Sequence, residues 1–395
     1  MTSACGSGAS QVSNPNAAVE QALAQARASL GGHAPTLGLL FCSPKLDLNA
    51  VLEAAAAQQP GAQFIGCTTA GEFTERGRTD GGLSAFLLAH DDALFDVRVA
   101  AGIAEDVAAS ADTLAQGYAR IADEAVRRGA SASTTLTLVD GLCAAGERLT
   151  NELRRATRPF QQVIGGAAGD DAAFAQTLVG RPGEVLRGGA VVAHVFDHSN
   201  WGVGMGHGLS PDTDRMTVTR AEGNVVYEID DRPAFDVYLA HAARNGKTLT
   251  PQEAPGYMVQ YEIGVYFFDE LRFARAPLGV GADGSLTLAG DLPKGSTICL
   301  LDGERPQMLK AAREAAQEAK RGLAGADAAG VLVFDCVCRG QLLAEDFGRE
   351  IDAVRDVFGD VPVSGFLTYG EIARYRGKLQ GWNNATAVVL AIPRS

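Results

Sequence analysis

The sequence predicts an α/β protein with mixed, largely parallel sheets and a ligand cleft at the strand ends. Three observations support this fold class. Apolar, strand-like runs alternate with helix-like segments, the same strand–helix–strand unit recurs, and a glycine-rich turn closes each unit. Strands that alternate with crossover helices favour parallel pairing. Open parallel sheets place their ligands beyond the carboxyl ends of the strands.

Length and composition indicate the general class of protein. The chain has 395 residues, enough for two domains, of which 46% are hydrophobic and 21% charged, as in globular proteins. No apolar run reaches the roughly 18 residues of a membrane helix, so we expect no membrane span. Residues 1–16 are small and polar and lack the basic and apolar segments of a secretory signal. We expect them to form a disordered tail.

The first unit begins at the apolar run LGLLFCS (37–43), which we interpret as a strand. A segment rich in helix formers follows at 46–57, and AQFIG then leads into the turn GCTTAGE (66–72). Another apolar strand comes after the turn, at 83–89. The order is therefore strand, helix, strand, glycine-rich turn, strand.

A weaker version of this unit lies in the middle of the chain. LTLVDG (136–141) reads as the strand and ERLTNELRRA (147–156) as the helix, with its leucines on one side. The turn is QVIGGAAGD (162–170), one residue shorter and with Asp in place of Glu. An apolar strand follows at 190–196.

The last unit repeats the first most closely. A strand at 331–336 precedes an amphipathic helix at 343–358, and the turn GFLTYGE (365–371) shares four of seven residues with GCTTAGE. The strand TAVVLAI (386–392) ends the unit. TICLLDGE (297–304) echoes LTLVDG and leads into a further helix.

The repeated turn allows two interpretations. Its glycines permit positive φ and close backbone approach, and its Thr and Glu side chains can hydrogen-bond exposed amides and so brace the turn. Alternatively, the turns line a pocket, facing each other across a shared cleft with both glutamates near one cavity. The candidates for this second role are Thr69, Glu72, Thr368, Tyr369 and Glu371.

Charge and cysteine content narrow the partners. The formal charge is −13 and there is no basic cluster, which argues against binding to nucleic acid or to an anionic membrane surface. The seven cysteines are scattered and odd in number, which favours reduced, mostly buried thiols in a cytoplasmic protein. There is no G-x-S-x-G elbow and no Cys/His nucleophile signature, so we do not expect an enzyme.

Six stretches in order resemble the FIST-domain family of α/β sensory proteins. The resemblance implies a FIST N-terminal domain over residues 17–234 and a FIST C-terminal domain over 235–395. It covers almost the whole chain from residue 36. The stretches are FIGCTTAGEF (64–73), VIGGAAGDDAAF (163–174), GMGHGLSP (204–211), VTRAEGNVVYEIDDRPAFDVY (218–238), LVFDCVCRG (332–340) and VPVSGFLTYGEIA (361–373) with NNATAVVL (383–390).

The family resemblance implies a small-ligand sensor in signal transduction. One branch of the family consists of stand-alone proteins of about this length that bind heme and sense nitric oxide, and similarity to it implies regulation of a separate histidine kinase or cyclic-di-nucleotide signalling partner. A second hypothesis is a sensor for a small polar metabolite such as an amino acid, without heme. A third is a scaffold that binds only proteins. A homodimer is compatible with each, and no sequence feature decides it.

Heme iron needs an axial donor, usually His, Cys, Met or Tyr. His207 is the first candidate for the heme iron, because it lies in the family stretch GMGHGLSP, where the glycines would let a flat macrocycle approach. His241 is the second, because Tyr238 and Phe235 give it an aromatic neighbourhood.

Three further residues are ligand-binding candidates. Cys336 and Arg339 match the family's C-x-x-R pattern, which implies a thiol facing the pocket and a guanidinium that pairs with a carboxylate. Asn383 is the third, in an Asn-Asn pair where relatives often carry His beside Asn. This departure puts in question any ligand role that depends on a histidine there.

Overall fold

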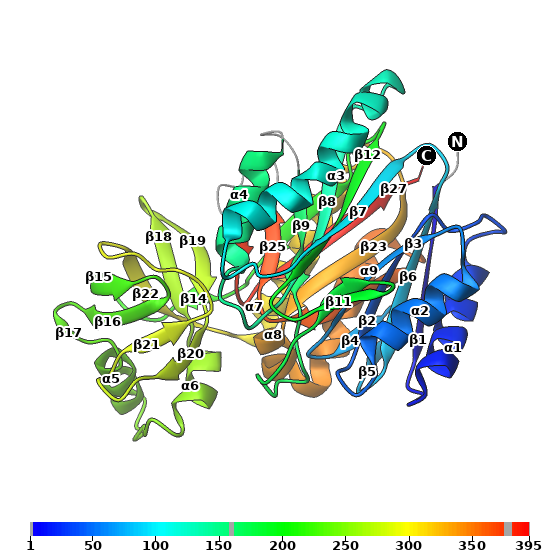
Figure 1. The fold of residues 1–395 in the computed structure, drawn as a ribbon. Coiled ribbons are helices and arrows are strands. Elements are labelled where there is room, and N and C mark those ends of the chain that lie inside the picture. The colour runs from blue at the N-terminus through cyan, green and yellow to red at the C-terminus, as the bar shows by residue number, and fades with distance from the viewer. Residues whose placement is uncertain (1–2, 158–161, 375–380, 395) are drawn as a thin grey trace.

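The computed structural model describes residues 3–157, 162–374 and 381–394. These residues form a large body and a smaller lobe, drawn at the right and left of Figure 1. Within them, the body contains three six-stranded sheets and the lobe a nine-stranded one. The α/β class and the mixed sheets are confirmed.

The body is built from three repeats of one unit, and the first occupies the N-terminal part of the chain. Its sheet order is β1-β6-β2-β3, with β2 and β3 parallel and the other pairs antiparallel. The elements are β1 (Ser3–Ser10), α1 (Pro15–Ala28), β2 (Leu37–Cys42), α2 (Leu48–Gln58), β3 (Gln63–Thr68), β4 (Glu72–Thr74), β5 (Gly77–Thr79) and β6 (Leu83–His90).

The second repeat has the same order of elements and the equivalent sheet order, β7-β12-β8-β9. Its two central strands, β8 and β9, are again the parallel pair. The elements are β7 (Leu94–Ala100), α3 (Val107–Arg127), β8 (Ala132–Val139), α4 (Gly146–Ala156), β9 (Gln162–Ala167), β10 (Val179–Arg181), β11 (Glu184–Leu186) and β12 (Ala190–Asp197).

The third repeat is interrupted after its first strand by the small lobe. Its sheet order, β13-β27-β23-β24, matches the other two, with β23 and β24 parallel. The elements are β13 (Gly202–Gly206), α7 (Arg305–Gly322), β23 (Ala328–Cys336), α8 (Val337–Leu343), the 3-10 turn η1 (Ala344–Asp346), α9 (Phe347–Phe358), β24 (Val363–Thr368), β25 (Glu371–Arg374), β26 (Trp382–Asn383) and β27 (Ala387–Pro393).

The small lobe lies between β13 and α7 in the chain. Buried residues such as Val218, Tyr238 and Ile298 form a core of its own. The expected boundary at 234/235 lies inside this lobe, between β17 and α5. The elements are β14 (Ser210–Pro211), β15 (Met216–Glu222), β16 (Val225–Ile229), β17 (Arg232–Pro233), α5 (Asp236–Arg244), α6 (Ala254–Gln260), β18 (Ile263–Phe267), β19 (Glu270–Arg275), β20 (Pro277–Val280), β21 (Leu286–Leu288) and β22 (Thr297–Asp302).

The disordered tail expected at residues 1–16 is wrong for the described part of that segment. Ser3–Ser10 forms strand β1, antiparallel to β6. Its small residues are required by packing, because α1 lies directly against the strand. A Cβ on Gly6 would lie 1.8 Å from the carbonyl oxygen of Ala26, and one on Gly8 would lie 2.0 Å from that of Ala22. A composition that resembles disorder is therefore a close helix–strand contact.

Each repeat donates the hairpin after its glycine-rich turn to a neighbouring sheet. The hairpin β4-β5 pairs with β24 of the third repeat, β10-β11 pairs with β3 of the first, and β25-β26 pairs with β9 of the second. The exchange is cyclic, so every repeat is tied to both others by backbone hydrogen bonds. The expectation of largely parallel sheets needs correction, because each body sheet has one parallel pair among its described strands and the rest are antiparallel.

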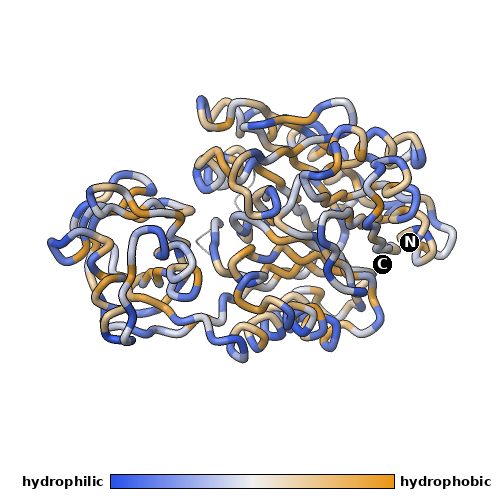
Figure 2. Tube along the Cα trace, turned by 90° about the horizontal axis from the view of Figure 1, so that it is seen from below, coloured by the Kyte–Doolittle hydropathy of each residue, from blue (hydrophilic) through white to orange (hydrophobic). Residues whose placement is uncertain are grey.

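The three sheets share an apolar core. Phe41 of β2, Phe366 of β24 and Leu136 of β8 are buried in one cluster, and the rings of Phe41 and Phe366 have centroids 4.6 Å apart. In Figure 2 the hydrophobic segments run through the interior of the body and of the lobe. No helix in the described chain is long and apolar enough to cross a membrane.

Candidate functional site

The three glycine-rich turns meet at the centre of the body. Each turn exchanges backbone hydrogen bonds with another, so that the turns form a closed ring. The bonds run from Ala70 N to Leu367 O (3.0 Å), Leu367 N to Gly71 O (2.7 Å), Gly169 N to Thr68 O (3.0 Å), Asp171 N to Thr69 O (2.9 Å), Tyr369 N to Ala167 O (3.2 Å) and Ala167 N to Gly370 O (2.8 Å).

In the first turn, the Thr and Glu side chains that recur in the third turn bind each other. The Thr69 hydroxyl donates to Glu72 over 2.8 Å, and the same carboxylate accepts the amide of Gly82 at 2.6 Å, just before β6. Both side chains are fully buried. Burial raises the pKa of Glu72 to about 7, against the hydrogen bonds from Thr69 and Gly82, which lower it.

The third turn repeats this arrangement. The Thr368 hydroxyl donates to Glu371 over 2.6 Å, and the carboxylate accepts the amide of Thr386 at 3.1 Å, just before β27. Burial raises the pKa of Glu371 well above its usual range. The Thr–Glu pairs therefore brace the turn and hold the start of the strand that follows it.

In the second repeat, a different residue holds the start of the strand that follows the turn. Asp140, directly after β8, accepts the amide of Gly188 at 2.7 Å, just before β12, and the Thr177 hydroxyl at 2.7 Å. The shorter turn of this repeat has no Thr–Glu pair, and Asp140 supplies the carboxylate from the neighbouring strand end.

A cavity of about 500 Å³ lies between the body and the small lobe. The body contributes residues after the carboxyl ends of β8 and β23, together with Tyr369 and Trp382. The lobe contributes residues of α6, β20 and β21. Its size falls within the range of small-molecule sites.

The predicted site residues divide between the cavity and the interior. Cys336 and Tyr369 line the cavity, whereas Thr69, Glu72, Thr368 and Glu371 do not. This corrects the prediction that both glutamates lie near one cavity, and it favours the bracing alternative. Asn383 is buried behind the wall, and its neighbour Asn384 lines the cavity instead.

Arg339 is fully buried and points into the body. It pairs with Asp335 at 3.0 Å and with Glu350, both carboxylates being buried. It also donates to the backbone carbonyls of His207 and Met308. The guanidinium thus connects β23, α9, α7 and the end of β13. These contacts indicate a structural role, not ligand binding.

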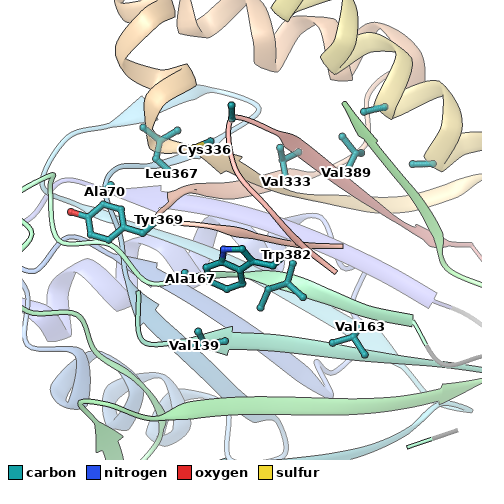
Figure 3. Close-up of a cluster of buried hydrophobic side chains, with 14 of the residues drawn as sticks. Ala70, Val139, Val163, Ala167, Val333, Cys336, Leu367, Tyr369, Trp382 and Val389 are labelled. Atoms are coloured by element: carbon teal, nitrogen blue, oxygen red, sulfur yellow. The ribbon is translucent and has the colours of Figure 1, made fainter. Parts of the chain in front are cut away.

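Aromatic rings form part of the cavity wall. Phe174 and Tyr369 stack with ring centroids 4.5 Å apart and planes 9° apart. The Tyr369 hydroxyl donates to the buried Asp170. Trp382 lines the cavity too, and its indole N–H donates 2.9 Å to the carbonyl of Ala289 in the lobe. Figure 3 shows Cys336, Tyr369 and Trp382 over the same buried cluster.

Two residues of the cavity wall, one acid and one thiol, were not predicted from the sequence. Glu262 lines it and is 1% exposed, yet no N–H or O–H group of the described chain donates to its carboxylate, which has only the weak thiol donor of Cys338 beside it. Cys338 lines it as well, with its sulfur 3.2 Å from that of Cys336. Glu262 lies just before the apolar strand β18 in no recognisable motif, so only its position, an acid beside an apolar run, could have drawn attention.

The predicted heme ligands do not fit heme in this structure. Neither His207 nor His241 lines the cavity. His241 lies in the lobe with both ring nitrogens engaged, 2.7 Å from the Tyr257 hydroxyl and 2.6 Å from Asp212. The Nδ1 atom of His207 accepts the amide of Leu209 at 3.0 Å. Burial and, to a smaller extent, the charge of Arg339 lower the pKa of His207 to about 4.

The His, Cys, Asp and Glu side chains of the described residues form no cluster of three that could hold a metal ion. The cysteine pair of the cavity wall therefore has no third ligand of these types in place. We derive no step through heme or a metal.

Comparison with known family models covers most of the chain. The model of the FIST N domain matches residues 36–232, and that of the FIST C domain matches residues 234–374. An uncharacterized protein of Mycobacterium tuberculosis is 24% identical over 384 residues, covering 94% of this chain and 95% of that protein. An uncharacterized protein of Methanocaldococcus jannaschii is 39% identical over 77 residues, 20% of this chain and 15% of that protein, so the match spans a small part of its length.

Solved structures give weak similarity. A cyanuric acid hydrolase has a TM-score of 0.32 with 11% identity over the whole of both chains. PurL of Thermotoga maritima has a TM-score of 0.23 with 12% identity, covering 99% of this chain and 73% of that one. Similarity at this level carries no argument about function.

Proposed function

We propose that this chain, which belongs to the FIST family of signal-transduction sensors, binds a small metabolite in the cavity between its body and its small lobe. One observation carries the proposal. The cavity is bounded by the body on one side and by the lobe on the other, and the lobe joins the body in the chain only through the segments after β13 and before α7. A ligand that contacts both sides changes how the lobe rests on the body.

A small polar metabolite suits this cavity better than heme. The wall combines aromatic rings with Glu262, Asn384 and the thiols of Cys336 and Cys338, a mixture typical of metabolite sites. The two histidines predicted as axial ligands lie elsewhere. We propose a sensor, not an enzyme, that signals through a separate protein such as a histidine kinase or a cyclic-di-nucleotide enzyme.

Equilibrium dialysis against a low-molecular-weight cell extract tests the proposal, with mass spectrometry of what the protein retains. Ala276→Trp should fill the cavity, because Ala276 lies on its wall. Leu239→Trp adds the same side chain at an exposed position of the lobe that does not line the cavity. We expect the wild type and the Leu239 variant to enrich the same molecule and the Ala276 variant to lose it. Equal enrichment by all three proteins, or by none, would remove the proposal.

A further inference from the structure

The Glu262 carboxylate lacks a strong hydrogen-bond donor. It is 1% exposed and lines the cavity, and no N–H or O–H group of the described residues donates to it, although the Cys338 thiol, a weak donor, lies beside it. Buried carboxylates without a donor are costly and rare. The three other acids of the wall differ from it: Glu147 pairs with Arg275, Asp140 accepts three hydrogen bonds, and Asp291 is exposed to water.

Another part of the cavity wall is aromatic. Phe174 and Tyr369 stack on each other, and Trp382 lines the same cavity. Aromatic faces attract organic cations, and the attraction grows when the cation is removed from water. The aromatic wall and the Glu262 carboxylate come from different elements, and together they suit a ligand with a cationic group and an apolar part.

From these two features we infer that the cavity takes an organic amine, bound as an ammonium ion that donates to the Glu262 carboxylate while its apolar part rests against the aromatic wall. The inference rests on the proposed function and names the class of ligand for that site. No covalent bond to the ligand forms; when Glu262 is protonated before binding, its O–H bond breaks and the proton passes to water.

The surroundings of Glu262 make this binding dependent on pH. Burial raises the pKa of Glu262 to about 8, the Cys338 thiol and the Arg339 charge lower it, and Glu371 raises it. Tyr238 of α5 also lies within electrostatic reach. Below pH 8 the empty site is mostly protonated, so binding an ammonium ion must release that proton. A primary ammonium stays charged through this range. Affinity should therefore rise from pH 6 to pH 8.

Three probes of one size and different charge test the inference: 2-phenylethylamine, 2-phenylethanol and phenylacetate, titrated calorimetrically into the full chain at pH 8. We expect the amine to bind at least about tenfold more tightly than the other two, the typical effect of one charge-assisted hydrogen bond. Glu262→Gln should remove both this preference and the rise in affinity with pH. Glu72→Gln is the matched control, because Glu72 is also buried with a raised pKa but does not line the cavity.

A second variant keeps the test informative if Glu262→Gln does not fold. Phe174 is 49% exposed, so Phe174→Ala should fold, and it should weaken binding of the amine several-fold, through lost contact with its phenyl ring, while the preference for the amine over phenylacetate remains. Equal or tighter binding of the alcohol or the carboxylate, or a charge preference that survives Glu262→Gln, overturns the inference.

The outcomes separate the inference from the proposed function. A carboxylate probe that binds, and is blocked by Ala276→Trp, leaves the cavity as the sensor site and overturns only the amine class. If no probe binds, the net charge of the molecule retained in dialysis decides: a cation supports the inference, and a neutral or anionic molecule overturns it. If nothing is retained, both fail.

Discussion

Arg275 of the small lobe forms a two-pronged ion pair with Glu147 of the body, with its Nη2 atom 3.0 Å from Oε1 and 3.1 Å from Oε2. The guanidinium also donates to the backbone carbonyl of Trp382 at 3.3 Å. Because Arg275 is buried and Glu147 lies in the first turn of helix α4, the pair fixes the lobe against the body beside the cavity. The ligand site thus depends on a contact between two separately packed parts.

Glu147→Ala should destabilise this contact by about 3 kcal/mol, because it leaves a buried guanidinium without its partner. Urea denaturation followed by lobe fluorescence and by hydrogen exchange measures the loss. Glu152→Ala on the same helix is the control, since Glu152 pairs with the exposed Arg155 and should change stability by less than about 1 kcal/mol. Equal effects of the two variants would show that the Arg275 pair does not hold the lobe.

Glu72 should make stability depend on pH. Its pKa of about 7 in the folded protein exceeds the ordinary value of 4.5, so its contribution is fully present below pH 4.5 and is lost as pH rises through 7. Relative to Glu72→Gln, the wild type should lose about 3 kcal/mol of unfolding free energy between pH 4.5 and pH 8. Glu20→Gln, at an exposed position, should show no such slope. A flat difference for Glu72→Gln would contradict the burial-driven shift.

The Thr–Glu braces should each carry measurable stability. Thr368→Val removes the hydroxyl that donates to Glu371 and should cost about 1–2 kcal/mol, as should Thr69→Val. Thr113→Val is the matched change, because the Thr113 hydroxyl donates to its own helix at the surface, and it should stay within about 0.5 kcal/mol. If Thr368→Val were as neutral as Thr113→Val, the turns would not be braced as described.

Added hemin should give no saturable Soret band in the visible spectrum. The reason is positional: His241 has both ring nitrogens engaged, and His207 lies off the cavity wall. Hemin titration of the wild type and of His207→Ala measures this. A sharp band in the wild type that disappears in His207→Ala would instead assign heme to a site at the end of β13.

The repeated units were predictable, because apolar periodicity is local. All three strand–helix–strand–turn units occur where the pattern placed them, including the weak copy with its shortened turn. Strand β1 was missed because its small residues show no strand-like pattern. Gly6 and Gly8 occur there because α1 packs closely against the strand. The exchange of hairpins and the inserted lobe depend on contacts between distant segments, which periodicity does not contain.

The candidate site was predicted only in part. Cys336 and Tyr369 were found because they sit in recurring stretches at strand ends, and they do line the cavity. The turn glutamates lie in the same recurring stretches, but their carboxylates bind groups inside the protein. In sequence, a buried carboxylate that accepts an amide and a hydroxyl looks the same as one that meets a ligand. Glu262 was missed because its significance lies in the absence of a strong donor, which only the folded structure shows.

Hydrogen exchange of the full chain, with and without the molecule retained in dialysis, tests the central claim most directly. The account predicts slower exchange on both sides of the cavity at once, in α6 of the lobe (254–260) and in α8 of the body (337–343). Protection confined to one side, or centred on the end of β13 around His207, would contradict a ligand site between body and lobe.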